Sequence, residues 1–234
     1  MRRFALALTL LALVVPAARA DDVSRGRALF AQGCVSCHGP TADGIANRGP
    51  SLHGVGARAA HFYLTTGYMP LRDPFQQPER QDPAYSPDDV RALVAYVGSL
   101  GGPPVPRPHP EQGSIRDGLK LFTAHCAGCH QIGAAGGYVP GGVAVALDDA
   151  TATQIAEAVR IGPYLMPRFP PQTISDRDLD SIIAYVGLTK DPVDRGGWPI
   201  GHIGPVTEGL VAWLIAGSAL VLLVLVIGER AKRE

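Results

Sequence analysis

Hydrophobic and polar positions alternate with a helical period in two stretches of the chain, residues 86–100 and residues 175–188. In both stretches apolar residues recur every three or four positions around a shared Ala-Tyr-Val segment, which predicts an amphipathic helix. Ser86 and Ser175 stand where a helix N-cap is expected, and acidic residues follow in the first turn. We therefore expect one helix to begin beside each serine.

These two helices close two copies of one repeat. At an offset of 92, residues 26–38 match residues 118–130, and both segments contain Gly-x-x-x-Phe followed by Cys-x-x-Cys-His. The copies predict two domains, at residues 21–100 and 113–190. Between them, residues 101–112 are rich in proline and predict a semi-rigid linker.

The two ends of the chain are apolar in different ways. Residues 1–20 have the pattern of a cleaved signal peptide, although such a segment can also stay as a second anchor. Residues 209–228 lack any charge and predict a transmembrane helix, since a buried core helix would keep an amphipathic face. Residues 191–208 are expected to form a hinge before this transmembrane helix. The tail, residues 229–234, carries three basic residues, which predicts that the C-terminus lies in the cytoplasm and that both repeats lie on the extracytoplasmic side of the cell membrane.

Composition narrows the class of protein. Lys and Arg together number 21, as do Asp and Glu, so no net charge indicates a nucleic-acid partner. A hydrophobic fraction of 46% excludes a disordered chain. The 28 glycines and 21 prolines favour short helices joined by long irregular loops, as in a fold built around a cofactor.

The four cysteines of the chain all belong to two Cys-x-x-Cys-His motifs. In this motif the cysteines bond covalently to haem and the adjacent imidazole ligates the iron. Tetrahedral zinc is the alternative, but each motif would then need a fourth ligand. A redox dithiol would not need the histidine. We predict two covalently bound haem c groups, held by Cys34, Cys37 and His38 in the first copy and by Cys126, Cys129 and His130 in the second.

The opposite face of each iron needs a second ligand. Apart from the initiator, the chain has two methionines, Met69 and Met166, one in each copy and each followed by proline. A methionine is more often a core residue, but core packing would not place one per copy between the same two elements. We therefore predict both as axial ligands, with His53 and His61 as rivals to Met69. Histidine and methionine together leave no open site on the iron, which favours electron transfer over peroxidase chemistry.

Other residues are expected to support the haem. A glycine and a phenylalanine spaced by four would let a second helix cross closely, with a tyrosine from that helix beside the ring; plain core packing is the equal alternative. Pro50 and Pro140 are candidates for the carbonyl that orients each haem histidine, or simply make the loops rigid. The packing residues are Gly26, Phe30 and Tyr96 in the first copy, and Gly118, Phe122 and Tyr185 in the second.

Together these parts resemble the cytochrome cc subunit of the actinobacterial-type menaquinol:cytochrome c reductase, the cytochrome bcc complex. The resemblance covers essentially the whole chain and implies a mainly α fold, with two tandem class I cytochrome c domains and one C-terminal transmembrane helix. It rests on the order of the parts and on four stretches, residues 34–40, 67–71, 164–169 and 204–213.

The resemblance also implies partners. The first haem would accept electrons from the Rieske iron-sulfur protein, and the second would pass them to a cytochrome c oxidase in aerobic respiration. Quinol oxidation would belong to the Rieske and cytochrome b subunits of this translocase, so this subunit would do no acid or base chemistry. A dihaem carrier independent of any reductase, or a dihaem peroxidase, would share the haem motifs and remain the alternatives.

Overall fold

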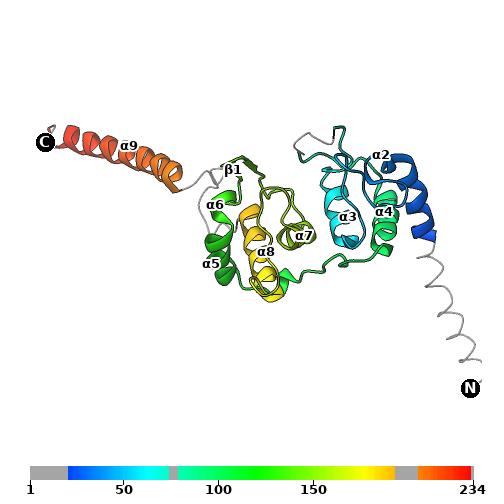
Figure 1. The fold of residues 1–234 in the computed structure, drawn as a ribbon. Coiled ribbons are helices and arrows are strands. Elements are labelled where there is room, and N and C mark those ends of the chain that lie inside the picture. The colour runs from blue at the N-terminus through cyan, green and yellow to red at the C-terminus, as the bar shows by residue number, and fades with distance from the viewer. Residues whose placement is uncertain (1–20, 74–78, 193–204, 233–234) are drawn as a thin grey trace, which may run out of the picture. The chain divides into compact units, whose positions relative to one another are not determined.

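The structure is a computed structural model of the 234-residue chain. The chain forms two units, residues 1–187 and residues 188–234. The predicted signal peptide and residues 193–204 of the predicted hinge lie outside the described residues. Figure 1 shows the order of the elements. The described stretches are residues 21–73, 79–192 and 205–232.

The first repeat, residues 21–100, consists of helices joined by loops. The predicted helix at residues 86–100 is confirmed, because α4 begins directly after Ser86, whose hydroxyl accepts a hydrogen bond from the amide of Asp89. Proline at the first helical position has its φ already fixed near the helical value, which strengthens this start. The described helices are residues 21–33, α2 (Val35–His38), α3 (Gly56–Thr65) and α4 (Pro87–Ser99).

The second repeat, residues 113–190, has the same helices and an added hairpin. Its last helix is the predicted one, with the hydroxyl of Ser175 accepting a hydrogen bond from the amide of Asp178 at 3.1 Å. The short helix η1 (Pro110–Gln112) ends the linker. The elements of the repeat are α5 (Ile115–His125), α6 (Ala127–His130), β1 (Gly137–Val139), β2 (Gly142–Ala144), α7 (Ala152–Ile161) and α8 (Asp176–Lys190).

The predicted close helix crossing is present in both repeats. A Cβ added at Gly26 would overlap the carbonyl of Ala92 on α4, and one added at Gly118 would overlap the carbonyl of Ser181 on α8. Only glycine lets the two backbones approach this closely. The first and last helices of each repeat are therefore packed directly against one another at this glycine.

The aromatic partners predicted at these crossings also meet. The rings of Phe30 and Tyr96 lie 5.2 Å apart between centroids, and those of Phe122 and Tyr185 lie 5.3 Å apart. All four side chains are buried. Tilted aromatic pairs at such distances stabilise a core beyond the area that they bury.

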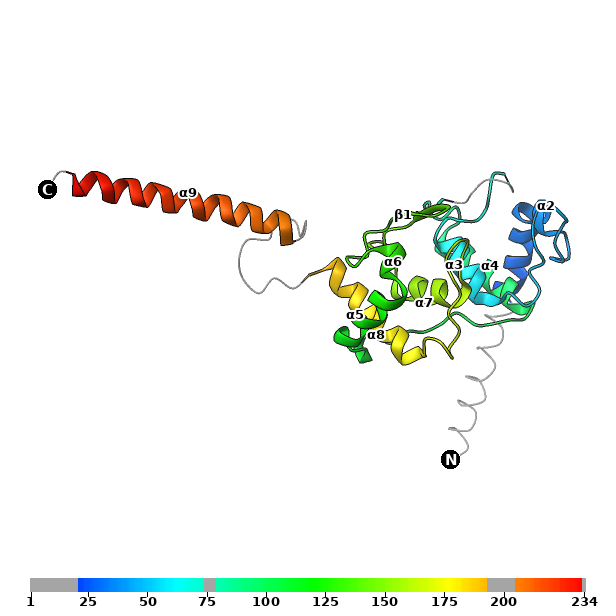
Figure 2. The same cartoon turned by 60° about the vertical axis from the view of Figure 1, so that its left-hand side comes forward.

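The two repeats pack against each other within the first unit. Helix α3 of the first repeat contacts α7 of the second, and the two lie side by side in Figures 1 and 2. The linker has neither helix nor strand over residues 103–109. It is tied to the first repeat where the amide of Arg58 donates to the carbonyl of Pro103, and to the second where the amide of His109 donates to Asp180.

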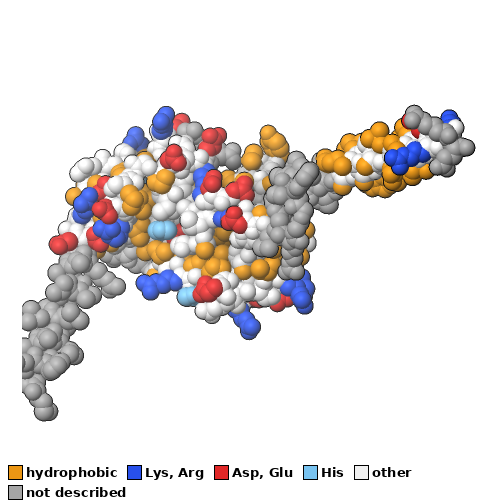
Figure 3. Space-filling view, turned by 180° about the vertical axis from the view of Figure 1, so that it is seen from behind, with side chains coloured by type: hydrophobic (Ala, Val, Ile, Leu, Met, Phe, Trp, Pro, Cys, Tyr) orange, Lys and Arg blue, Asp and Glu red, His pale blue; other side chains and the backbone are white. Residues whose placement is uncertain are grey.

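The second unit contains one long helix, α9 (Pro205–Ala231). An 18-residue window within its stretch Gly209–Ala231 has a mean hydropathy of 2.9, and none of that window is buried in the described structure. Figure 3 shows hydrophobic side chains covering this helix. The predicted transmembrane segment is therefore a candidate membrane span by length and composition, and the helix runs three residues beyond its predicted end at 228.

Candidate functional site

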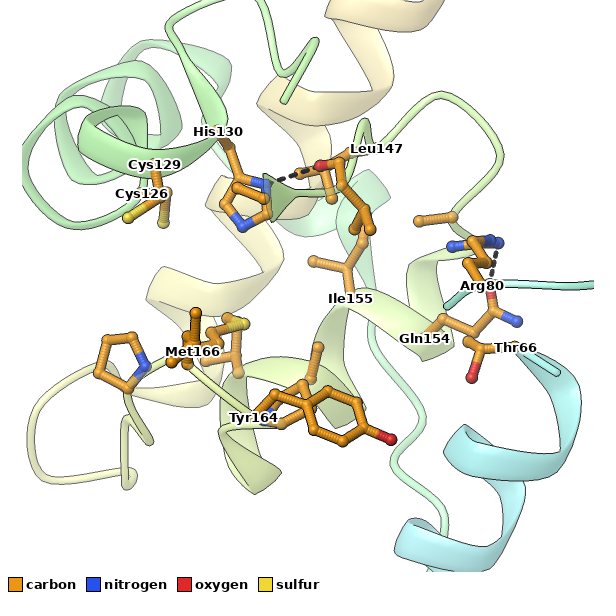
Figure 4. A pocket seen from close by; sticks show the side chains of 18 of the residues that line it. Thr66, Arg80, Cys126, Cys129, His130, Leu147, Gln154, Ile155, Tyr164 and Met166 are labelled. Carbon is orange, nitrogen blue, oxygen red and sulfur yellow. Dashed lines mark hydrogen bonds between the residues drawn. The ribbon is translucent and has the colours of Figure 1, made fainter. Parts of the chain in front are cut away.

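A cavity of about 520 Å³ lies in the second repeat. All four residues predicted there as haem-binding line it: Cys126, Cys129, His130 and Met166. Figure 4 shows His130 and Met166 on opposite sides of the cavity and the two cysteines together at one end. The other walls are mostly apolar and come from α5, α7, α8 and the hairpin, including Phe122, Val143, Leu147, Ile155, Val159, Ile182 and Val186.

The ring of His130 is oriented by the backbone. Its Nδ1 donates a hydrogen bond to the carbonyl of Val145 at 2.9 Å, which leaves Nε2 as the nitrogen available to a metal. A hydrogen bond of this kind fixes the tautomer and the ring plane of a metal-binding histidine. The prediction that Pro140 supplies this carbonyl is wrong. Pro140 lies in the turn between β1 and β2, and the chain passes through this hairpin before Val145 reaches the ring.

The equivalent contact in the first repeat is the predicted one. Nδ1 of His38 donates to the carbonyl of Pro50 at 2.8 Å. The acceptor lies 12 residues after the histidine here and 15 residues after it in the second repeat, because the second loop contains the hairpin. Both histidines are therefore presented in the same way although the loops differ.

The two histidines that rivalled Met69 are engaged elsewhere. Nε2 of His53 lies 2.9 Å from the carbonyl of Thr41 and 3.2 Å from Asp43, on the exposed side of its loop. Nδ1 of His61 lies 2.8 Å from the carboxylate of Glu157, which belongs to the second repeat. These contacts support Met69 as the ligand, and its assignment stays a prediction.

The loops that carry the two methionines are held by backbone hydrogen bonds. The amide of Met69 donates to the carbonyl of Tyr63 at 3.0 Å, at the end of α3. The amide of Met166 donates to the carbonyl of Pro163 at 2.9 Å, after α7. Each methionine thus follows the helix that faces the other repeat.

The cysteine environments do not suit a reactive dithiol. Burial raises the pKa of the Cys126 thiol to about 11 and also raises that of Cys34, where a hydrogen bond with Tyr85 acts in the opposite direction. A redox-active thiol needs the opposite shift. Zinc would require three or four side chains converging on one point, and the described part of the chain has no such group of histidine, cysteine or acidic residues.

Sequence analysis missed the contribution of the first repeat to this cavity. Phe62, Thr66, Tyr68, Glu79 and Arg80 all line it, although they precede its own haem motif by 46 residues or more. No motif marks these residues, because their role depends on how α3 docks on α7. The capping pair Thr151 and Gln154 at the start of α7 was a sequence feature that could have located that helix.

Two family models match the chain. Residues 23–101 match the model described as Cytochrome c, and residues 113–186 match the model described as Cytochrome C oxidase, cbb3-type, subunit III. Both are cytochrome c domains, so the predicted fold class is confirmed. Cytochrome c domains carry covalently bound haem c, which agrees with the Cys-x-x-Cys-His motifs and with the shape of the cavity.

Relatives of known assignment match across most of the chain. The cytochrome bc1 complex cytochrome c subunit of Corynebacterium diphtheriae is 34% identical over 229 residues, which cover 89% of this chain and 81% of that protein. The subunit of the same name from Mycobacterium tuberculosis is 36% identical over 216 residues, covering 88% and 77% respectively. A cytochrome c-553-like protein of Synechocystis matches 34% of this chain at 39% identity. The chain therefore belongs to the family of cytochrome bc1 complex cytochrome c subunits.

Proposed function

We propose that this chain is a membrane-anchored dihaem cytochrome c that relays electrons from the Rieske iron-sulfur protein of a menaquinol-oxidising complex to a terminal cytochrome c oxidase. Family membership establishes a cytochrome c subunit of a bc1-type complex, and hence electron transfer. The observation that carries the haem-binding part of the proposal is the cavity in which Cys126, Cys129, His130 and Met166 converge. The proposed electron donor and acceptor rest on the family.

Each repeat would hold one haem. The cysteines would form the thioether bonds, and Nε2 of the histidine and Sδ of the methionine would ligate the iron. When bound, haem iron supplies a one-electron couple, and histidine with methionine ligation favours its reduced form. The chain contributes ligands, an apolar enclosure and fixed geometry. The proposed sets are Cys34, Cys37, His38 and Met69 in the first repeat and Cys126, Cys129, His130 and Met166 in the second.

The contact between the repeats supports transfer from one haem to the other. Tyr68 directly precedes Met69, and Tyr164 stands two residues before Met166. Their rings lie 5.3 Å apart between centroids, so the two methionine loops meet at the interface. Haems ligated by these methionines would therefore be connected through two loops whose rings contact one another.

The partners follow from the family. We propose the Rieske iron-sulfur subunit as electron donor, the cytochrome b subunit as a further neighbour, and cytochrome c oxidase as acceptor. Helix α9 would anchor the chain in the cell membrane, with the haem repeats on the extracytoplasmic side and the basic tail in the cytoplasm. The subunit would contribute no acid or base chemistry to the quinol reaction of this translocase.

Purification in a mild detergent, followed by haem-type spectroscopy, tests this proposal. We expect haem b, an iron-sulfur protein and oxidase haems to accompany the chain. Recovery of the chain with haem c alone would instead support an independent dihaem carrier. Rapid cyanide binding to one haem of the unmodified chain would support a peroxidase, because a methionine ligand blocks that position.

A further inference from the structure

The cavity of the second repeat has two chemically different ends. Figure 4 shows Cys126 and Cys129 at one end, and Thr66, Arg80 and Gln154 at the other. In a covalently attached haem the thioether bonds form at the vinyl positions, and the two propionate carboxylates project from the opposite edge of the macrocycle. A haem bonded to these cysteines, as in the proposed function on which this inference rests, therefore directs its carboxylates toward Arg80.

Arg80 belongs to the first repeat but is held by the second. Its Nη2 donates to the carbonyl of Asp149 at 3.0 Å and to Oε1 of Gln154 at 3.3 Å. Both of these hydrogen bonds are made by Nη2. A half-buried guanidinium that is fixed through Nη2 still carries N–H groups on Nε and Nη1, and either can donate a charge-assisted hydrogen bond to a carboxylate.

Gln154 makes this placement rigid. Gln154 is the N3 residue of α7 and forms a capping box with the N-cap residue Thr151, whose backbone amide donates a hydrogen bond to Oε1 of Gln154. Its Nε2 donates to Oγ1 of Thr65 at 3.1 Å and to the carbonyl of Thr65 at 3.2 Å. One buried amide therefore binds the helix start, the end of α3 and Arg80, so the docking of the repeats determines where the guanidinium lies.

The charges near this end of the cavity favour the same ligand. Tyr68 and Arg80 both line the cavity. Burial raises the pKa of Tyr68, and the positive charge of Arg80 acts in the opposite direction. Glu79 also lines the cavity, but its side chain is exposed and its charge is screened by solvent. Arg80 is thus the cation that the apolar cavity presents to an anionic group.

We propose that Arg80 of the first repeat binds a propionate carboxylate of the haem held by the second repeat. The first repeat would then complete the cofactor site of the second and influence its reduction potential. A cation beside the propionates disfavours the oxidised iron, which carries one more positive charge than the reduced iron. Docking of the repeats and the potential of the second haem become linked through this one side chain.

Redox titration of the haem-loaded full-length chain in detergent tests the proposal, using Arg80→Gln. The wave of the first haem is identified by its loss in a Cys34→Ser, Cys37→Ser variant. We expect Arg80→Gln to lower the midpoint potential of the second haem only, with its sulfur-to-iron absorption band unchanged. Arg80→Lys keeps the charge without the guanidinium group, and should give a smaller fall in the same direction.

A control variant separates carboxylate binding from a general effect of lost charge. Arg107→Gln removes the same charge from the exposed linker and should leave both potentials unchanged. Equal potentials in Arg80→Gln and Arg107→Gln would overturn the proposal. Absence of a second covalent haem from the unmodified chain would instead contradict the proposed function, and intact mass detects it.

Discussion

The rings of Tyr68 and Tyr164 meet edge to face at the interface of the two repeats, with 5.3 Å between centroids and 66° between planes. Tyr63 joins them, with its ring 6.1 Å from that of Tyr164. Each of Tyr68 and Tyr164 lies in the loop that carries one of the predicted methionine ligands. The aromatic contact therefore joins the two methionine loops directly.

This contact predicts a difference between two substitutions at Tyr164. Tyr164→Phe keeps the ring, so electron transfer between the haems should keep its rate. Tyr164→Leu removes the ring contact and opens a gap, so the rate should fall. The rate of electron transfer is measured by reducing one haem with a light flash and following the reduction of the other haem by its absorption. An unchanged sulfur-to-iron band serves as the control for Met166 ligation, and equal rates in the two variants would contradict a role for the ring.

The glycine at the helix crossing of the second repeat makes a prediction about stability. Gly118→Ala would place a Cβ on the carbonyl of Ser181, and overpacking of this kind typically costs about 1–3 kcal/mol. Gly187→Ala is the matched control, because a Cβ there meets nothing within 4 Å in the same domain. It should be neutral, or stabilise by about 0.5–1 kcal/mol through helix propensity. Denaturant unfolding of the haem-loaded chain compares the two, and equal stability would contradict the close crossing.

Glu157 predicts how the stability of the paired repeats depends on pH. Burial raises the pKa of its carboxyl, and the hydrogen bond from His61 acts in the opposite direction. A carboxyl whose folded-state pKa is raised stabilises the fold at low pH, and this contribution is lost as the pH rises through that pKa. Relative to Glu157→Gln, which cannot titrate, the wild-type free energy of unfolding should therefore fall as the pH rises from about 4 to 7.

An exposed acid provides the control for this pH series. Hydrogen bonds from the backbone and from His109 hold the pKa of Glu111 below its ordinary value, so its contribution has the opposite sign and is lost as the pH falls. Glu111→Gln should not reproduce the trend of Glu157→Gln. If the difference between wild type and Glu157→Gln does not change with pH, the carboxylate is not buried at the interface.

Local chemistry made much of this fold predictable. Ser86 and Ser175 marked two helix starts because capping depends only on neighbouring residues, and the spacing of Gly118 and Phe122 marked the crossing because it follows the helical period. The contact of His130 with Val145 could not be predicted in the same way. It depends on a hairpin whose length has no counterpart in the first repeat.

The interface between the repeats was beyond the reach of sequence patterns. Arg80 looks like an ordinary loop residue until α3 docks on α7, and Glu157 looks like a solvated helix residue although its side chain is fully buried. Such roles arise from the fit of two surfaces far apart in sequence. The haem motifs could be predicted because their chemistry is confined to five consecutive residues.

The tail after α9 predicts the orientation of the chain in the membrane. Basic residues beside a membrane span favour the cytoplasmic side of the membrane. A reporter that works only in the cytoplasm should therefore be active when it is fused after Glu234, and an exported reporter should be inactive there. Paired fusions to a cytoplasmic and an exported reporter measure this, with expression of both checked by immunoblot. Activity of the exported reporter would reverse the proposed sidedness of the haem repeats.

The most direct test of the central claim is a redox titration of the purified full-length chain, followed through the absorption of haem c. Two haems with histidine and methionine ligands should give two reversible one-electron waves per chain. Met69→Leu and Met166→Leu should each shift one wave to lower potential and leave the other in place, since the volume is conserved and only the ligand is lost. A single one-electron wave per chain, or waves unaffected by both substitutions, would contradict the account of this chain as a two-haem relay.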